Sequence, residues 1–258
     1  MSNIVDVESL IYKAATASEQ LLPDINHEGI YCQAYCMDNV KEFFNTLFND
    51  IAGVTGDDDF IFVFGSEHNY RKVLNPDYKA HRVEQRKHPM LGIVKKYIIE
   101  KYNTTFTDWL EADDVCRILY ENNPFKNTII SIDKDLRTFP VKLLNPDRMD
   151  DGIVKITPEQ ADYNFATQLI MGDKTDGYGG VSGYGEAKTR RLLDSCKDKL
   201  TVDKVKELFL GAGGNTLDFI HTYNMAHIIG RNDYYEGIGI KLYNTYFDFN
   251  KGEQVEKL

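Results

Sequence analysis

The sequence has few cysteines and no long apolar run. Its cysteines form no Cys-x-x-Cys pair and have no zinc spacing with histidine, so we expect them to be reduced and structural. They are Cys32, Cys36, Cys116 and Cys196. No apolar stretch approaches ~18 residues, and no basic segment followed by an apolar one opens the chain, which argues against a membrane span and a secretion signal. We therefore expect a cytoplasmic protein.

Positive charge is also scarce. The 30 Lys and Arg residues are outnumbered by 40 Asp and Glu residues, and the formal net charge of −10 argues against a protein that coats nucleic acid. Residues 71–96 are an exception, with eight Lys or Arg, two acids and several aromatic side chains in or beside the segment. Basic residues interleaved with aromatics suit a nucleic-acid backbone with exposed bases. The alternative is an ordinary solvated loop.

What the sequence does contain is enough apolar material for a folded α/β chain. Hydrophobic residues make up 42% and aromatics 12% of 258 residues, which suffices for one large domain or a domain with a smaller appendage. Strand-like runs alternate with helical periodicity, which predicts a parallel sheet covered on both faces. The expected strands are 3–7, 59–64, 106–110 and 127–132, and the expected helices include 37–54, 90–101 and 111–122.

A second kind of sequence begins near residue 150. Thr157, Pro158 and Gln160 open a helix with a capping-box pattern. It leads to the glycine-rich turn GYGGVSGYG at 177–185, which precedes another helix. Backbone N–H groups in such a turn can bind a phosphate. We expect further helices at 202–210 and 216–230, and we expect the last eight residues, KGEQVEKL, to be a solvated tail.

The acidic residues of 110–135 lie beside very apolar sequence. In a helix, Glu111 and Asp114 would share the core-facing stripe, where no Lys or Arg recurs at matching spacing. A bound cation would neutralise them there. Asp133 and Asp135 leave the end of a buried strand on one side, because strand side chains alternate. Carboxylates suit hard divalent cations, and paired Mg²⁺ ions ~4 Å apart serve phosphodiester chemistry.

Structural roles remain open for the same acids. Acidic residues in a helix's first turn favour the helix dipole, and Asp113 has the spacing to pair with Arg117. Asp6 and Glu8, which follow the first strand, are suited to capping the next helix.

Five strings occur here in the order in which they occur in the 5′-nuclease or flap endonuclease family. The chain most resembles the short bacteriophage 5′ to 3′ exonucleases of that family, over roughly its first three quarters. The strings are IVD at 4–6, NYRKVLNPDYKAHR at 69–82, LEADD at 110–114, ISIDKDLRT at 130–138 and MGDKTDGYGGVSGYGEAK at 171–188.

The resemblance implies a PIN-like nuclease core in residues 1–150, with a helical arch at about 68–100 that admits single-stranded 5′ ends. Residues 151–258 would form a helical DNA-binding region that contains the glycine turn in a helix-turn-helix element. The implied activity is metal-dependent hydrolysis of DNA to 5′-phosphate products, by exonuclease or flap endonuclease action, in phage replication or host DNA degradation. The protein would act in the host cytoplasm on DNA with a 5′ end, flap or nick, and an RNA–DNA hybrid is a further candidate substrate.

The same resemblance assigns roles to individual residues. The ligands of two Mg²⁺ or Mn²⁺ ions would be Asp6, Glu111, Asp113, Asp114, Asp133, Asp135, Asp173 and Asp176. Lys79 and Arg82 would be the basic pair that approaches the scissile phosphate. DNA contacts are expected from Lys13, Arg71, Tyr78, Gly180, Gly183, Gly185, Lys188, Arg190 and Arg191, with Tyr78 stacking on a base. The carbonyls of the glycine turn are a candidate K⁺ site.

One position departs from the family pattern. The second strand of the family usually ends in a metal-binding Asp, whereas this chain has Gly65-Ser66-Glu67 there. We expect water, rather than Glu67, to complete the metal shell. Two other functions remain open, a non-catalytic protein that binds DNA structures and an RNA-directed PIN-type ribonuclease.

Overall fold

The computed structural model describes residues 2–26, 29–81, 87–196 and 201–258. A six-stranded sheet crosses its middle, and its neighbours are parallel except at the last strand, β8. In spatial order the strands are β5 (Thr104–Thr105), β4 (Phe60–Val63), β1 (Asn3–Asp6), β6 (Thr128–Ile130), β7 (Val141–Leu144) and β8 (Val154–Ile156). The predicted α/β class is confirmed.

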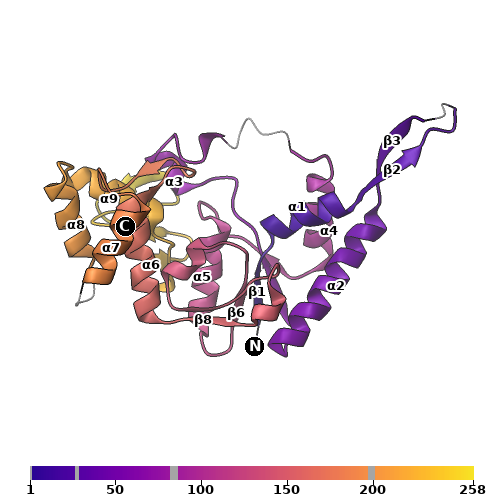
Figure 1. Ribbon diagram of the computed structural model, residues 1–258, viewed down its shortest axis with the longest axis horizontal. Helices are drawn as coiled ribbons and strands as arrows, with labels where there is room; N and C mark the ends of the chain where they lie inside the picture. Colours follow the sequence, from indigo (N-terminus) through magenta and orange to yellow (C-terminus); the bar gives the residue numbers. More distant parts are fainter. Residues whose placement is uncertain (1, 27–28, 82–86, 197–200) are drawn as a thin grey trace.

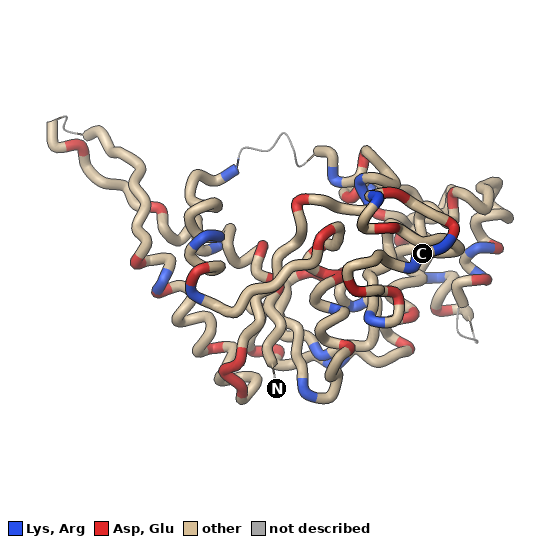
Figure 2. The backbone as a smooth tube through the Cα atoms, turned by 180° about the vertical axis from the view of Figure 1, so that it is seen from behind, with Lys and Arg blue, Asp and Glu red and all other residues tan. Residues whose placement is uncertain are grey.

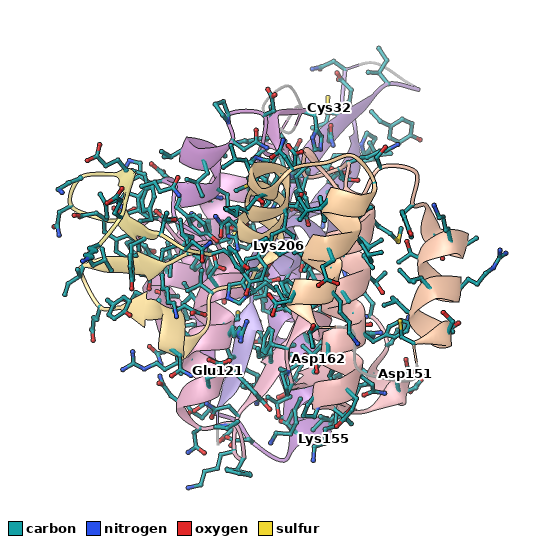
Figure 3. The ribbon with its side chains drawn as sticks, turned by 90° about the vertical axis from the view of Figure 1, so that its left-hand side faces the viewer. Cys32, Glu121, Asp151, Lys155, Asp162 and Lys206 are labelled. Atoms are coloured by element: carbon teal, nitrogen blue, oxygen red, sulfur yellow. The ribbon has the colours of Figure 1, made fainter. Side chains whose placement is uncertain are left out.

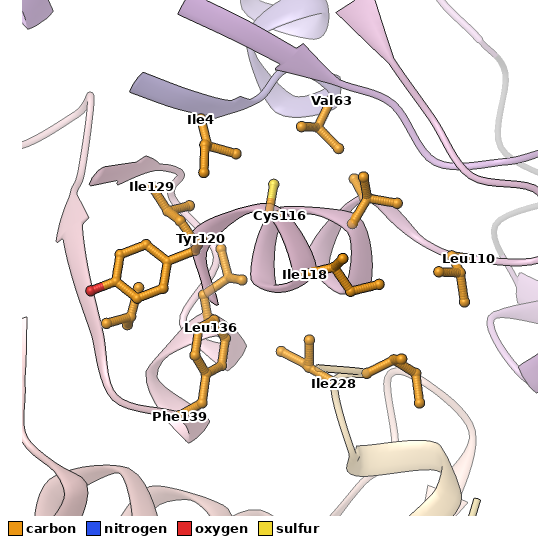
Figure 4. Close-up of a cluster of buried hydrophobic side chains, with 14 of the residues drawn as sticks. Ile4, Val63, Leu110, Cys116, Ile118, Tyr120, Ile129, Leu136, Phe139 and Ile228 are labelled. Carbon is orange, nitrogen blue, oxygen red and sulfur yellow. The ribbon is translucent and has the colours of Figure 1, made fainter. Parts of the chain in front are cut away.

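Helices cover both faces of this sheet because consecutive strand residues point to opposite sides. Ile4 belongs to one core cluster and Val5 to the other. The Val5 cluster includes buried residues of α1 (Glu8–Ala17), α2 (Met37–Thr55) and α4 (Leu91–Lys101), and the Ile4 cluster includes those of α5 (Ala112–Asn122). Figure 4 shows Cys116 and Ile118 of α5 within the Ile4 cluster.

Four further helices gather at one end of the molecule around a third core cluster (Figure 1). They are α6 (Pro158–Met171), α7 (Glu186–Ser195), α8 (Val202–Gly211) and α9 (Thr216–Ala226). The predicted capping box is present, since Thr157 Oγ1 accepts from Gln160 N and Gln160 Oε1 accepts from Thr157 N. Between α6 and α7, β9 (Gly172–Asp173) and β10 (Tyr178–Gly179) form a small hairpin.

The expectation of an all-helical region at 151–258 is wrong. The chain leaves α9 at Ala226 and forms an antiparallel sheet of β11 (Tyr234–Tyr235), β12 (Gly239–Lys241), β13 (Tyr246–Asp248) and β14 (Glu253–Val255). The predicted solvated tail therefore pairs with β13. Ile228 packs into the Ile4 cluster (Figure 4). Strands of two or three residues leave too few alternations to be recognised in the sequence.

Other short elements also escaped prediction. The expected strand at 106–110 is wrong, because β5 ends at Thr105 and Phe106 is exposed. Between α1 and α2, β2 (Glu19–Pro23) and β3 (Tyr31–Tyr35) form a hairpin that projects from the body in Figure 1. Figure 3 places Cys32 of β3 far from Lys155 of β8, and all four cysteines are free thiols as predicted. Within the described ranges, 3-10 helices include Asp135–Thr138, Met149–Asp151 and Arg231–Asp233.

The segment predicted to be an arch runs between the two ends of the molecule. Its first helix, α3 (Tyr70–Leu74), packs against α9, whereas α4 packs against α1. Of the described parts of this segment, α3 thus lies at the helical end and α4 lies beside the sheet (Figure 1).

Candidate metal centre

A polar cavity of about 210 Å³ lies beyond the carboxyl end of β6. Acidic segments from separate parts of the chain meet near the middle of the molecule (Figure 2). Six of the eight predicted metal ligands line the cavity: Glu111, Asp113, Asp133, Asp135, Asp173 and Asp176. They meet because parallel strands bring their carboxyl ends to one edge of the sheet, where the start of α5 and the β9–β10 hairpin also lie.

Three of these acids form a compact group. Asp135, Asp173 and Asp176 each offer one oxygen, and these oxygens lie within 4.8 Å of one another. The hairpin turn fixes Asp173, because its Oδ1 accepts from Thr175 N at 2.8 Å and from Asp176 N at 3.2 Å. Oxygens bound to one Mg²⁺ at ~2.1 Å lie at similar separations from each other, so the group fits a divalent cation.

A second group of acids lies at the ends of β1 and β6. Ser131 Oγ donates to Asp6 Oδ2 at 2.8 Å, and Asp135 N donates to Asp133 Oδ1 at 2.8 Å. Burial raises the pKa of Asp6 to about 6, with further increases from Glu8 and Asp133 that the Ser131 hydrogen bond opposes. The sequence analysis missed Ser131, although its place two residues before Asp133 follows the alternation of the strand.

Like charge accumulates around these acids. Burial raises the pKa of Asp113 well above its usual range, and the nearby carboxylates of Asp133 and Asp6 raise it further. Burial and then Asp133 raise the pKa of Asp135 to about 6. Anionic oxygens held together in this way favour a bound cation. The donor set therefore fits Mg²⁺ or a similar hard ion.

Asp114 accepts hydrogen bonds from several protein donors. Its carboxylate is fully buried and accepts from Arg71 Nη1 at 2.7 Å and Nη2 at 2.9 Å. Ile229 N at 2.8 Å and Glu111 N at 3.1 Å also donate to it. These donors satisfy both oxygens in this structure, and the role of Asp114 as a metal ligand stays a prediction. The positive charge that meets Asp114 on the core-facing stripe of α5 is the guanidinium of Arg71 in α3.

Arg71 and Tyr78 are buried in this structure, and their contacts with DNA stay predictions. Arg71 is 2% exposed and Tyr78 is 3% exposed. Arg71 Nη1 and Tyr78 Oη donate to Glu111 Oε2 at 3.1 and 2.8 Å. Both residues hold the amino end of α5 in place.

Lys79 lies inside the acidic cavity. Its Nζ donates to Glu111 Oε1 at 2.8 Å and lies 3.6 Å from Asp176 Oδ2. Its backbone has a φ of 54°, and its N–H donates to Asp176 O at 3.2 Å. Burial alone would lower the pKa of Lys79, but Glu111 and Asp176 outweigh burial and raise it. Arg82, the other predicted catalytic residue, lies outside the described residues.

Glu111 lines the acidic cavity and also contacts Arg71, which pairs with Asp114. It is the N-cap of α5, and its side chain faces Arg71, Tyr78 and Lys79. Burial opposes its ionisation, but the cations of Arg71 and Lys79 outweigh burial and lower the pKa of Glu111 to about 2. Glu111 therefore stays ionised and holds Lys79 over the cavity. Asp113 does not pair with Arg117, which binds Glu121 at 2.8 Å instead.

The other predicted DNA-contacting residues do not line the cavity. Lys13 of α1 forms an ion pair with Asp147. In the glycine turn, a Cβ at Gly180 would stand 2.2 Å from Ile170 O, and Gly183 has a φ of +75°, so the backbone needs both glycines. Gly185 is the N-cap of α7.

The basic side chains of α7 are exposed. Lys188 Nζ lies 3.3 Å from Gly183 O and 3.7 Å from the centre of the Tyr184 ring. Arg190 pairs with Glu186 at 2.7 Å, although both side chains are more than half exposed. Arg191 is exposed as well. These cations are accessible to an anionic partner.

Comparison with known proteins places the chain in a family. A family model described as the N-terminal resolvase-like domain of 5′-3′ exonucleases matches residues 2–163. An exonuclease of Escherichia phage T7 is 33% identical over 215 residues, which cover 67% of this chain and 69% of the relative. An exodeoxyribonuclease of Enterobacteria phage T3 is 33% identical over 144 residues, which cover 52% of this chain and 46% of the relative. The chain thus spans about half the length of the T3 relative.

The fold also matches a solved structure. The flap endonuclease of bacteriophage T5, crystallised with DNA and metal ions, superposes with a TM-score of 0.55 at 15% identity. The superposition covers 86% of this chain and 86% of that one. Since the family model spans more than half of the sequence, the chain belongs to the 5′-3′ exonuclease family.

Proposed function

We propose that the protein hydrolyses DNA phosphodiesters near a 5′ end, flap or nick, with two Mg²⁺ or Mn²⁺ ions held in the acidic cavity. The observation that carries this proposal is the gathering of carboxylates from separate parts of the chain around one cavity, in a chain that belongs to an exonuclease family. One ion would be held by Asp135, Asp173 and Asp176, and the other by Asp6, Asp113 and Asp133. Such ions supply an activated water and neutralise charge on the phosphate.

The protein's own residues would position the substrate around those ions. Lys79 Nζ is held by Glu111 at the cavity, where it can turn from that carboxylate to a phosphate oxygen. Glu111 would then become free to donate an oxygen to a metal. Ser131 fixes the rotamer of Asp6 by donating to Oδ2. The products would carry a 5′-phosphate.

A duplex-binding surface would lie at the glycine turn and α7. The turn presents backbone N–H groups, and α7 adds Lys188, Arg190 and Arg191, all exposed. We propose that these groups bind the phosphates of duplex DNA and that the carbonyls of the turn hold K⁺. An RNA–DNA hybrid is a second substrate of the same chemistry. The proposed place of action is the cytoplasm of a phage host. Within the described residues, no helix is long and apolar enough to span a membrane.

Incubation of the protein and Mn²⁺ with a 5′-flap duplex, a nicked duplex and an RNA-primed duplex tests this proposal. We expect cleavage of at least the flap or nicked substrate, 5′-phosphate ends on the products, and no cleavage with EDTA. Binding without cleavage would instead identify a non-catalytic DNA-binding relative. Cleavage confined to RNA strands would identify a ribonuclease.

A further inference from the structure

Gly65, two residues beyond the end of β4, has no side chain, and a carboxylate from α1 reaches its backbone. Glu8 Oε1 accepts a hydrogen bond from Gly65 N at 3.1 Å. A Cβ built on Gly65 would lie 3.1 Å from the same Oε1, with Ala112 N at 3.4 Å as its next neighbour. The carboxylate of Glu8 therefore stands between the end of β4 and the start of α5, where a short acidic side chain on Gly65 would place its own oxygens.

This location is also next to the Asp6 group. β1 and β4 are paired so that Asp6 lies opposite Val63, two residues before Gly65. The backbone N–H of Glu8 donates to the Asp6 carboxylate. Among the described residues, Glu8 has no ion pair with a Lys or Arg. Its negative charge thus adds to that of the Asp6, Asp113 and Asp133 carboxylates.

Glu67, the acid considered from the sequence, has a different position. It lines a separate cavity with Phe64, Phe106 and Asp108, outside the acidic cavity. Ser66, between Gly65 and Glu67, donates from Oγ to Asp108 Oδ1 at 2.6 Å. The chain after β4 therefore leads away from Asp6.

We propose that Glu8 is a ligand of the divalent cation bound by Asp6, Asp113 and Asp133, in place of the carboxylate that β4 lacks at Gly65. The inference rests on the proposed metal centre. A purely structural role would make Glu8 only a first-turn acid of α1 and an acceptor for Gly65 N–H. A metal ligand needs the negative charge of Glu8, whereas an acceptor for the Gly65 N–H does not.

Mn²⁺ binding to the protein without DNA separates these roles, measured by calorimetry on the wild type and on Glu8→Gln. Glutamine keeps an oxygen that accepts from Gly65 N–H but removes the charge. We expect Glu8→Gln to weaken one Mn²⁺ site by about tenfold or more, since even outer partners of metal ligands change affinity by 10- to 100-fold. The matched control, Glu67→Gln, removes an acid at the neighbouring cavity and should bind Mn²⁺ like the wild type.

A second variant tests the position of the charge rather than the identity of the residue. In Glu8→Gln with Gly65→Asp, a carboxylate returns to the same place from β4. The built Cβ of Gly65 closely approaches only the end of the Glu8 side chain, and Gly65 has no positive φ, so the backbone tolerates the change. We expect this double variant to recover most of the lost Mn²⁺ affinity, with melting temperatures near that of the wild type for both variants.

The outcomes are distinct for the two proposals. If the wild type binds two Mn²⁺ ions and Glu8→Gln binds them equally well, Glu8 is not a ligand and the proposed function stands. If the wild type binds no Mn²⁺, the metal centre and the role of Glu8 both fail.

Discussion

Asp113 and Asp114 are consecutive residues of α5, but their carboxylates have opposite surroundings. Asp114 faces the core and is matched by the guanidinium of Arg71 and two backbone N–H groups. Asp113 faces the cavity, where Asp133 and Asp6 add like charge. The comparison shows that one acidic string serves two purposes, because successive helix residues point in different directions. The ion pair of Asp114 with Arg71 stabilises the fold. The negative charge gathered around Asp113 favours a cation site.

The largest expected effect is on the cleavage rate, after a substitution in the acidic cavity. We expect Asp133→Asn to lower the rate of flap cleavage by orders of magnitude, because the cavity loses one of its anionic donors. Its melting temperature without metal should be unchanged or higher, since repulsion with Asp6 and Asp113 is relieved. Single-turnover cleavage in saturating Mg²⁺, with Asp151→Asn as the exposed acidic control, measures the effect. A near wild-type rate would remove Asp133 from the site.

Substitutions in the buried ion pair of Arg71 with Asp114 should lower the stability of the fold. We expect Asp114→Asn or Arg71→Met to lower the free energy of unfolding by about 3 to 5 kcal/mol, because either change leaves a buried charge without its partner. Urea denaturation measures this loss. Combining Arg71→Met with Asp114→Leu removes both charges and should recover part of it. If Asp114→Asn were as stable as Asp133→Asn, the distinction between the two carboxylates would fail.

The pH dependence of stability should distinguish Asp6 and Asp135 from Glu111 without any mutation. Asp6 and Asp135 have pKa values raised to about 6, whereas a free Asp has a pKa of about 3.9. The folded protein therefore binds more protons than the unfolded chain between these values, and the metal-free protein should lose stability as pH rises from about 4 to about 6. Glu111, whose pKa is lowered to about 2, makes stability depend on pH only in more acidic solutions.

Mg²⁺ should reverse that loss, because a cation favours the ionised carboxylates. We expect the increase in melting temperature on adding Mg²⁺ to be larger at pH 7 than at pH 5. Thermal melts in Mg²⁺ and in EDTA at each pH measure the difference. An increase that does not depend on pH would indicate that Mg²⁺ acts elsewhere on the protein.

The smallest expected effect concerns the basic surface of α7. Arg190→Ala with Arg191→Ala should weaken duplex binding and reduce its salt dependence, since each lost phosphate contact removes about 0.9 from the slope of log affinity against log salt. Two exposed lysines outside α7 provide a control that also removes two charges, in Lys126→Ala with Lys155→Ala. Equal slopes for the two double variants would place the duplex elsewhere.

Local patterns predicted much of this architecture. The unbroken apolar run before Asp133 predicted a buried strand with acids at its end, and the Thr157 box predicted the start of α6. Both signals involve residues close together in sequence. Likewise, the order of motifs in the sequence resembles that of a metal-dependent nuclease family.

Long-range partners could not be predicted in this way. Arg71 meets Asp114 from 43 residues away, and nothing in the helical stripe indicates which cation arrives there. The same limit applies to Tyr78, whose sequence neighbours suggested base stacking but whose hydroxyl group reaches Glu111. Glu8 was interpreted as a helix cap because only folding brings it to Gly65.

The most direct test of the central distinction is a crystal of the protein soaked in Mn²⁺, with the ions located by anomalous scattering. We predict one peak among Asp135, Asp173 and Asp176 and a second beside Asp6, Asp113 and Asp133, with Arg71 still bound to Asp114. An absence of peaks from the cavity, or a peak at Asp114 with Arg71 displaced, would contradict the account.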